Sequence, residues 1–159
     1  MKSNKSLLTV ILVALVAIAM SLVYLAAPGL AAEPKGKDLV GSWYATITVP
    51  AQNAEVPGLM SFTSDGIVIS DEVPSPLETS GHGNWVKTGP NEAAYAFVFL
   101  TGDPTPGKWV KGTVTGKLKY SPKTDEWSGP FNIVMVDQAG NPVMSDTGTM
   151  SGTRISAKP

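Results

Sequence analysis

Apolar and polar residues alternate along most of the chain from Leu39 onward. Successive side chains of an extended strand point to opposite faces of a sheet, so this alternation predicts strands with one apolar face. The first such segment is "LVGSWYATITVP", and the segments 108–120 and 126–137 show the same period. In the first segment the apolar face carries Trp43, Ala45, Ile47 and Val49. No segment after residue 38 shows a helical period.

Turn signals divide the region after residue 38 into eight predicted strands. Asp65-Gly66 lies between two alternating runs, which is typical of a tight hairpin. Because the links between consecutive strands are short, the strands should pair in sequence order as an antiparallel meander. An eight-stranded meander removes its two exposed edges by closing, so the predicted fold is all-β, an antiparallel up-and-down barrel. A β-sandwich is the alternative. Pro130 cannot donate to a ladder, so we expect an edge or a bulge there.

Two short motifs at the ends of this region resemble those of the calycin superfamily, which includes the lipocalins. They are "GSW", Gly41 to Trp43, on the first predicted strand, and Arg154 in "SGTRI" on the last. The resemblance implies a small secreted barrel, similar to lipocalin-like and avidin-like proteins, that binds a small ligand. In a closed barrel the first and last strands pair, so Arg154 can lie over the indole of Trp43 as a cation–π contact. Gly41 would let the chain turn in beneath them.

The segment before the predicted barrel has the form of an export signal. Lys2 and Lys5 precede an apolar run over residues 7–27, and "GLAA" supplies small residues for cleavage after Ala31 or Ala32. The run is also long enough to span a bilayer, so an uncleaved membrane anchor is the alternative. We therefore divide the chain into a signal or anchor helix (1–32), a linker (33–38), a barrel domain (39–156) and a tail (157–159).

Charge and composition exclude several classes of function. Removal of residues 1–32 takes away Lys2 and Lys5, which leaves ten basic against thirteen acidic residues and a net charge of −3. No basic patch predicts nucleic-acid binding. The chain has no Cys, so disulfides are excluded although export would permit them. The single His and the scattered carboxylates predict no metal site, and we expect no cofactor. Oligomeric state is not predicted.

If Trp43 marks the closed end of the barrel, the two longest loops, 50–58 and 72–80, lie at the open end. Barrels bind their ligands at the open mouth. We therefore predict that the exported protein, secreted, periplasmic or on the cell exterior, binds a small, largely apolar molecule there. The predicted lining comprises Ile47, Met60, Phe97, Phe99, Val114, Ile133, Met135 and Met144, with Asn84 and Asp146 oriented toward the polar end of the ligand.

The sequence does not decide whether the interior of the barrel is hollow or filled with side chains. An eight-stranded barrel is just wide enough to fill itself with side chains or to hold one small ligand. Inward glycines at positions 112, 129 and 148 favour a cavity because they occupy little room. A packed core is the equal alternative.

His82, the only histidine, and Asp146 are the weak catalytic candidates. Asp146 shares the inward face of the last strand, although a one-residue bulge would turn it outward. For His82, burial of Trp85 favours an outward orientation. If both face inward, a small enzyme of the cyclase or isomerase type that uses this acid–base pair is an alternative function. An extracytoplasmic protein-binding or structural module is a third.

Overall fold

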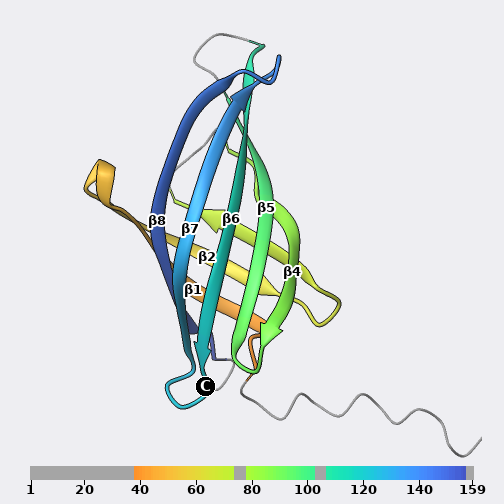
Figure 1. Ribbon diagram of the computed structural model, residues 1–159, viewed down its shortest axis with the longest axis vertical. Helices are drawn as coiled ribbons and strands as arrows, with labels where there is room; N and C mark the ends of the chain where they lie inside the picture. Colours follow the sequence, from red (N-terminus) through yellow and green to blue (C-terminus); the bar gives the residue numbers. More distant parts are fainter. Residues whose placement is uncertain (1–37, 74–77, 103–106, 157–159) are drawn as a thin grey trace, which may run out of the picture. The chain divides into compact units, whose positions relative to one another are not determined.

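The computed structural model describes residues 38–73, 78–102 and 107–156, and these form a closed eight-stranded barrel (Figure 1). All neighbouring strands are antiparallel and follow one another in sequence order. The strands are β1 (Gly41–Val49), β2 (Ala54–Phe62), β3 (Ile67–Glu72), β4 (Gly81–Gly89), β5 (Glu92–Gly102), β6 (Trp109–Ser121), β7 (Glu126–Asp137) and β8 (Pro142–Arg154). A single 3-10 turn, η1 (Pro50–Gln52), joins β1 to β2. The predicted up-and-down barrel is confirmed.

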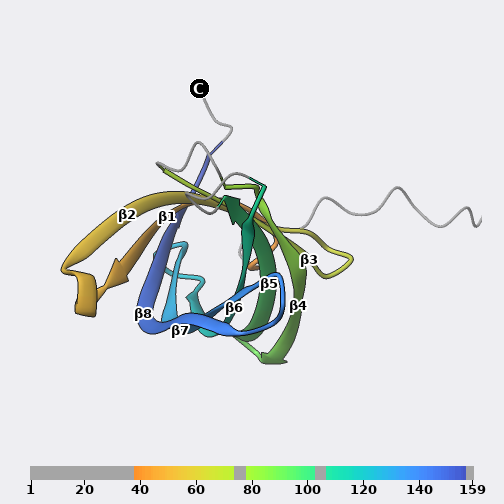
Figure 2. The ribbon, with the colours of Figure 1, turned by 90° about the horizontal axis from the view of Figure 1, so that it is seen from above.

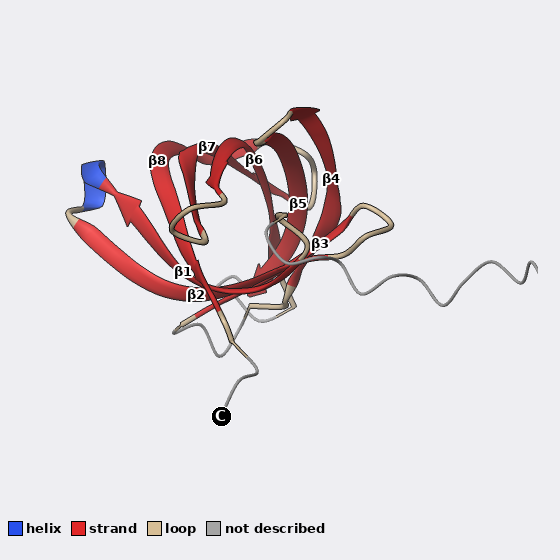
Figure 3. Ribbon diagram, turned by 90° about the horizontal axis from the view of Figure 1, so that it is seen from below, coloured by secondary structure: helices blue, strands red, loops and turns tan. Residues whose placement is uncertain are grey.

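The barrel closes through pairing of the first strand with the last. β1 pairs with β8 from Trp43↔Arg154 to Thr48↔Thr149. This ladder removes the two exposed edges that a flat sheet would have, so the sandwich alternative is wrong. The view along the barrel in Figures 2 and 3 shows the ring of strands, with the β1–β2 hairpin and η1 at one side.

The predicted signal or anchor and most of the linker lie outside the described residues. The first strand of the barrel begins at Gly41 and the last ends at Arg154. In the part of the chain that the structure describes, no helix is long and apolar enough to cross a membrane.

The connections divide the barrel into two ends as the sequence predicted. Strands β3, β5 and β7 begin at the end that contains Trp43, and strands β2, β4, β6 and β8 begin at the other. β2 begins at Ala54, so it is longer than the pattern suggested. The mouth is therefore bordered by η1 and by the ends of the longest strands, β6 and β8.

Inward aromatic rings lie over Gly112 and Gly148, which corrects the expectation that these two glycines leave a cavity. Phe99 and Gly112 are direct cross-strand neighbours, and a Cβ atom at Gly112 would lie 2.2 Å from the Phe99 ring. Phe131 covers Gly148 in the same way, with a corresponding distance of 2.5 Å. Two further pairs, Tyr95 over Gly116 and Trp127 over Gly152, repeat the arrangement. The glycines thus make room for rings, and much of the barrel is a packed core.

The predicted irregularity at Pro130 is present. Pairing between β6 and β7 runs from Val110↔Asp137 to Gly116↔Phe131 and resumes only at Lys119↔Ser128. Proline has no backbone N–H to donate, so the ladder is interrupted beside it. Pro130 is exposed and its strand continues on the other side through pairing with β8.

Candidate functional site

The closed end is sealed by the indole and the guanidinium that the sequence predicted. The Arg154 guanidinium carbon lies 4.1 Å from the centroid of the Trp43 ring, which is a cation–π contact. Trp43 is fully buried and its indole N–H donates to the Leu39 carbonyl at 3.0 Å. Gly41 has φ +139°, and a Cβ there would lie 2.4 Å from Arg154 Nη1. The predicted closure by Gly41, Trp43 and Arg154 is therefore what the structure contains.

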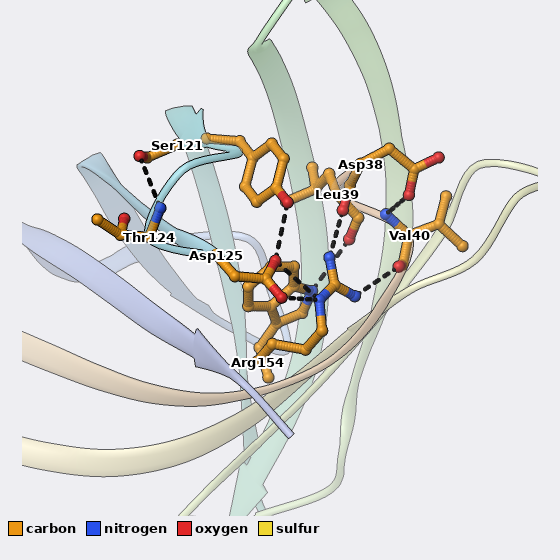
Figure 4. Close-up of polar contacts among 9 residues, drawn as sticks. Asp38, Leu39, Val40, Ser121, Thr124, Asp125 and Arg154 are labelled. Atoms are coloured by element: carbon orange, nitrogen blue, oxygen red, sulfur yellow. Dashed lines mark hydrogen bonds and ion pairs between the residues drawn. The ribbon is translucent and has the colours of Figure 1, made fainter. Parts of the chain in front are cut away.

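Asp125 completes this closure and was not predicted from the sequence (Figure 4). Arg154 Nε donates to both Asp125 carboxylate oxygens at 2.9 Å, while its other nitrogens donate to the Val40 and Asp38 carbonyls. The Tyr120 hydroxyl donates to Asp125 at 2.8 Å. Asp125 has φ +57°, a left-handed conformation that Asp tolerates better than most residues. The turn sequence "KTDE" was therefore the signal that could have indicated a special position for Asp125. These hydrogen bonds tie the end of β8 to the segment before β1 and to the turn between β6 and β7, so we assign the cluster to stability.

The apolar lining predicted for the ligand forms two zones. Five of its members, Ile47, Met60, Phe97, Phe99 and Val114, are buried and belong to one continuous core. Nearer the mouth, Ile133 and Met135 of β7 are half-buried against that core, as are Val49 of β1 and Val56 of β2. Met144 is 37% exposed and lies at the rim. The half-buried zone is where a ligand would find accessible apolar surface.

Asp146 has the inward parity that the sequence predicted, without the alternative bulge. It is half-buried, opposite Ile133, and shares a face of β8 with Gly148 and Met150. Gln52 of η1 donates to its carboxylate at 3.2 Å, and the Thr147 amide donates at 2.8 Å. Asp146 therefore has local partners and helps to hold η1 against the mouth.

His82 and Asn84 lie on the outside of the barrel. His82 is exposed and neighbours Val98, which is 39% exposed, whereas Gly81 is buried. Asn84 is also exposed and its amide donates to the Gly66 carbonyl at 3.3 Å, so its predicted place inside the mouth is wrong. The orientation follows from Trp85, whose indole turns inward and packs on Phe62. β4 and β8 are four strands apart in either direction around the ring, so the structure does not bring His82 and Asp146 together.

Two inward glutamates near the mouth were not predicted. Glu72 follows the buried Val68 and Ser70 on the inward face of β3, and Glu78 bridges to Thr101 just before β4. Among the described residues neither carboxylate has a hydrogen-bond or ion-pair partner. Burial, reinforced by the nearby charge of Glu78, raises the pKa of Glu72 to about 7. Burial also raises the pKa of Glu78. Parity in "IVISDE" was the signal for Glu72, and the proline-rich loop after it obscured that signal.

The described residues contain no group of three or more His, Cys, Asp or Glu side chains that could hold a metal ion. Three carboxylates, those of Glu72, Glu78 and Asp146, lie at inward positions near the mouth. No protein-family model and no curated protein matches the chain.

Proposed function

We propose that the protein is an exported, lipocalin-like barrel that binds a small, largely apolar molecule in its open end. The supporting residues are those of the half-buried zone, Ile133 and Met135 with Val49 and Val56, above a floor of buried aromatic side chains. Because Phe97, Phe99 and Phe131 pack the barrel below this zone, the ligand sits shallowly at the mouth.

The observation that carries the proposal is the inward, half-buried carboxylate of Glu72, for which the described residues supply no hydrogen-bond or ion-pair partner. Partial loss of water without a compensating partner destabilises the charged form of a carboxylate. Such groups with strongly shifted pKa values gather at functional sites. A ligand that donates a hydrogen bond, or carries a positive charge, would supply the partner that the described residues do not. Glu72 thus takes the place at the mouth that the sequence pattern had predicted for Asn84.

Binding of an apolar fluorophore, followed by its emission, tests this proposal. The emission should shift to the blue and saturate as protein is added, because the probe leaves water. Ile133→Trp should weaken binding by filling the half-buried zone. Val134→Trp is the matched control, because Val134 is the next residue on β7 and faces outward, with 47% exposure. The proposal fails if no apolar probe binds or if the two variants weaken binding equally.

Export rests on residues 1–32 and has its own test. N-terminal sequencing of the protein recovered outside the cytoplasm should begin at Ala32 or Glu33. A product that retains residues 7–27 in the membrane fraction would support the anchored alternative instead.

A further inference from the structure

The outer wall of the barrel carries a groove that the proposed function does not use. It lies near the closed end, has a volume of about 320 Å³, and crosses β1, β8, β7 and β6. Its floor is a cross-strand row of short hydroxyl side chains, Thr46, Ser151 and Ser128, which are register neighbours and point away from the core. A hydroxyl both donates and accepts hydrogen bonds, so this floor offers both functions side by side.

The two ends of the groove differ in chemistry. At one end stands Tyr44, 52% exposed, beside its cross-strand neighbour Leu59, which is 49% exposed. At the other end are the exposed side chains of Lys119 and Glu126. The described residues form no ion pair between these two, since the only one found is that between Arg154 and Asp125. A ligand would therefore meet an aromatic face, a row of hydroxyls and two available charges in succession.

The groove continues around the wall beyond Lys119. A second groove of about 270 Å³ shares Lys119 and Ser128 with the first and extends to Pro130. A third, of about 340 Å³, shares Lys117 and Pro130 with the second. The last two lie where the β6–β7 ladder is interrupted. The three together form a shallow track that crosses several strands, which suits an extended ligand better than a compact one.

We propose that this outer track binds a glycan strand. Sugar rings carry many hydroxyls that match a floor of Ser and Thr, and their apolar C–H faces pack on an exposed aromatic ring such as Tyr44. A strand of several sugar units spans adjoining shallow grooves, where a single unit would bind weakly. The site lies outside the barrel wall and is independent of the mouth.

Two other extended ligands fit the track less well. A peptide strand usually binds by adding to a free sheet edge, and the described strands form a closed ring without such an edge. A nucleic acid needs an excess of basic side chains, whereas Lys117 and Lys119 are accompanied here by Glu92 and Glu126. The glycan is the ligand that uses hydroxyls and an aromatic ring together.

Isothermal titration of the protein with cellohexaose, hexa-N-acetylchitohexaose and hexagalacturonate tests the proposal. At least one should bind, and Tyr44→Ala should weaken that binding by about tenfold or more. Ser128→Tyr, which fills the junction of the first two grooves, should also weaken it. Trp109→Ala is the matched control, because Trp109 is an exposed aromatic residue, 42% exposed, that does not line the track.

The proposal is overturned if none of the three hexasaccharides binds, or if Trp109→Ala weakens binding as much as Tyr44→Ala does. Uptake of the apolar fluorophore at the mouth should be unchanged in the Tyr44→Ala protein. The two binding measurements can therefore fail separately, one for the outer track and one for the open end.

Discussion

The partly buried charged side chains at the two ends of the barrel differ in their partners. At the closed end Arg154 is bonded to Asp125 and to two backbone carbonyls, and Asp125 is bonded in turn to Tyr120. At the open end Glu72 is inward and has no partner among the described residues. A fully satisfied cluster stabilises a fold, whereas an unsatisfied group is a cost that a ligand can remove. The difference assigns stability to the closed end and supports the proposal that the open end binds a ligand.

Removal of the indole at the closed end should have the largest effect. Trp43→Ala leaves a cavity at a fully buried position and deprives Arg154 of its ring, so the free energy of unfolding should fall by about 3–5 kcal/mol. Urea denaturation measures this loss. Trp109→Ala, at an exposed site, should change stability by less than about 0.5 kcal/mol. Equal losses of stability in the two variants would show that the Trp43 indole does not stabilise the closed end.

A methyl group in the packed middle of the barrel should cost less. Gly112→Ala brings a Cβ atom within 2.2 Å of the Phe99 ring, so the ring must move, at a cost of about 1–3 kcal/mol. Adding Phe99→Leu should recover part of that loss, because the smaller side chain leaves room for the methyl group. A double-mutant cycle in urea measures the coupling. Strict additivity would contradict the packing of ring over glycine.

Loss of the carboxylate charge at the closed end should have a similar or smaller effect. Asp125→Asn keeps the size of the side chain but removes the ion pair with Arg154, and we expect a loss of about 2 kcal/mol. The pair is partly exposed, so part of this loss should disappear in high salt. Thermal unfolding with and without salt checks both statements. An unchanged melting temperature in low salt would remove Asp125 from the closure.

Glu72 should make stability depend on pH in the opposite direction from an ion-paired carboxylate. Its pKa is raised from 4.5 to about 7 in the folded protein, so the folded state holds the proton more tightly than the unfolded state. The resulting stability is complete below about pH 4.5 and is lost as pH rises through 7. Glu72→Gln should abolish this loss and raise stability at pH 8 by about 1–2 kcal/mol. A wild-type protein whose stability does not fall relative to Glu72→Gln between pH 5 and pH 8 would contradict the account.

The strands and the closure were predictable from local pattern, because alternation and the two terminal motifs lie in the sequence itself. Trp43 and Arg154 could be paired in advance, since the first and last strands of a barrel must meet.

The role of the inward glycines was not predictable from the sequence, because Phe99 and Gly112 lie 13 residues apart and meet only through the exact register of β5 and β6. Asn84 was wrongly assigned to the inward face of its strand. Burial of the neighbouring Trp85 already indicated that Asn84 faces outward. Asp125 and Glu72 lie at strand ends, where the period gives its weakest signal.

The most direct test of the division between the two ends compares Glu72→Gln with Asp125→Asn in one fluorophore titration at pH 8, with urea unfolding of the same samples. The account predicts that Glu72→Gln changes the affinity for the apolar probe and does not lower stability, whereas Asp125→Asn lowers stability and leaves the affinity of the folded protein unchanged. Probe binding that responds to Asp125→Asn and not to Glu72→Gln would contradict it.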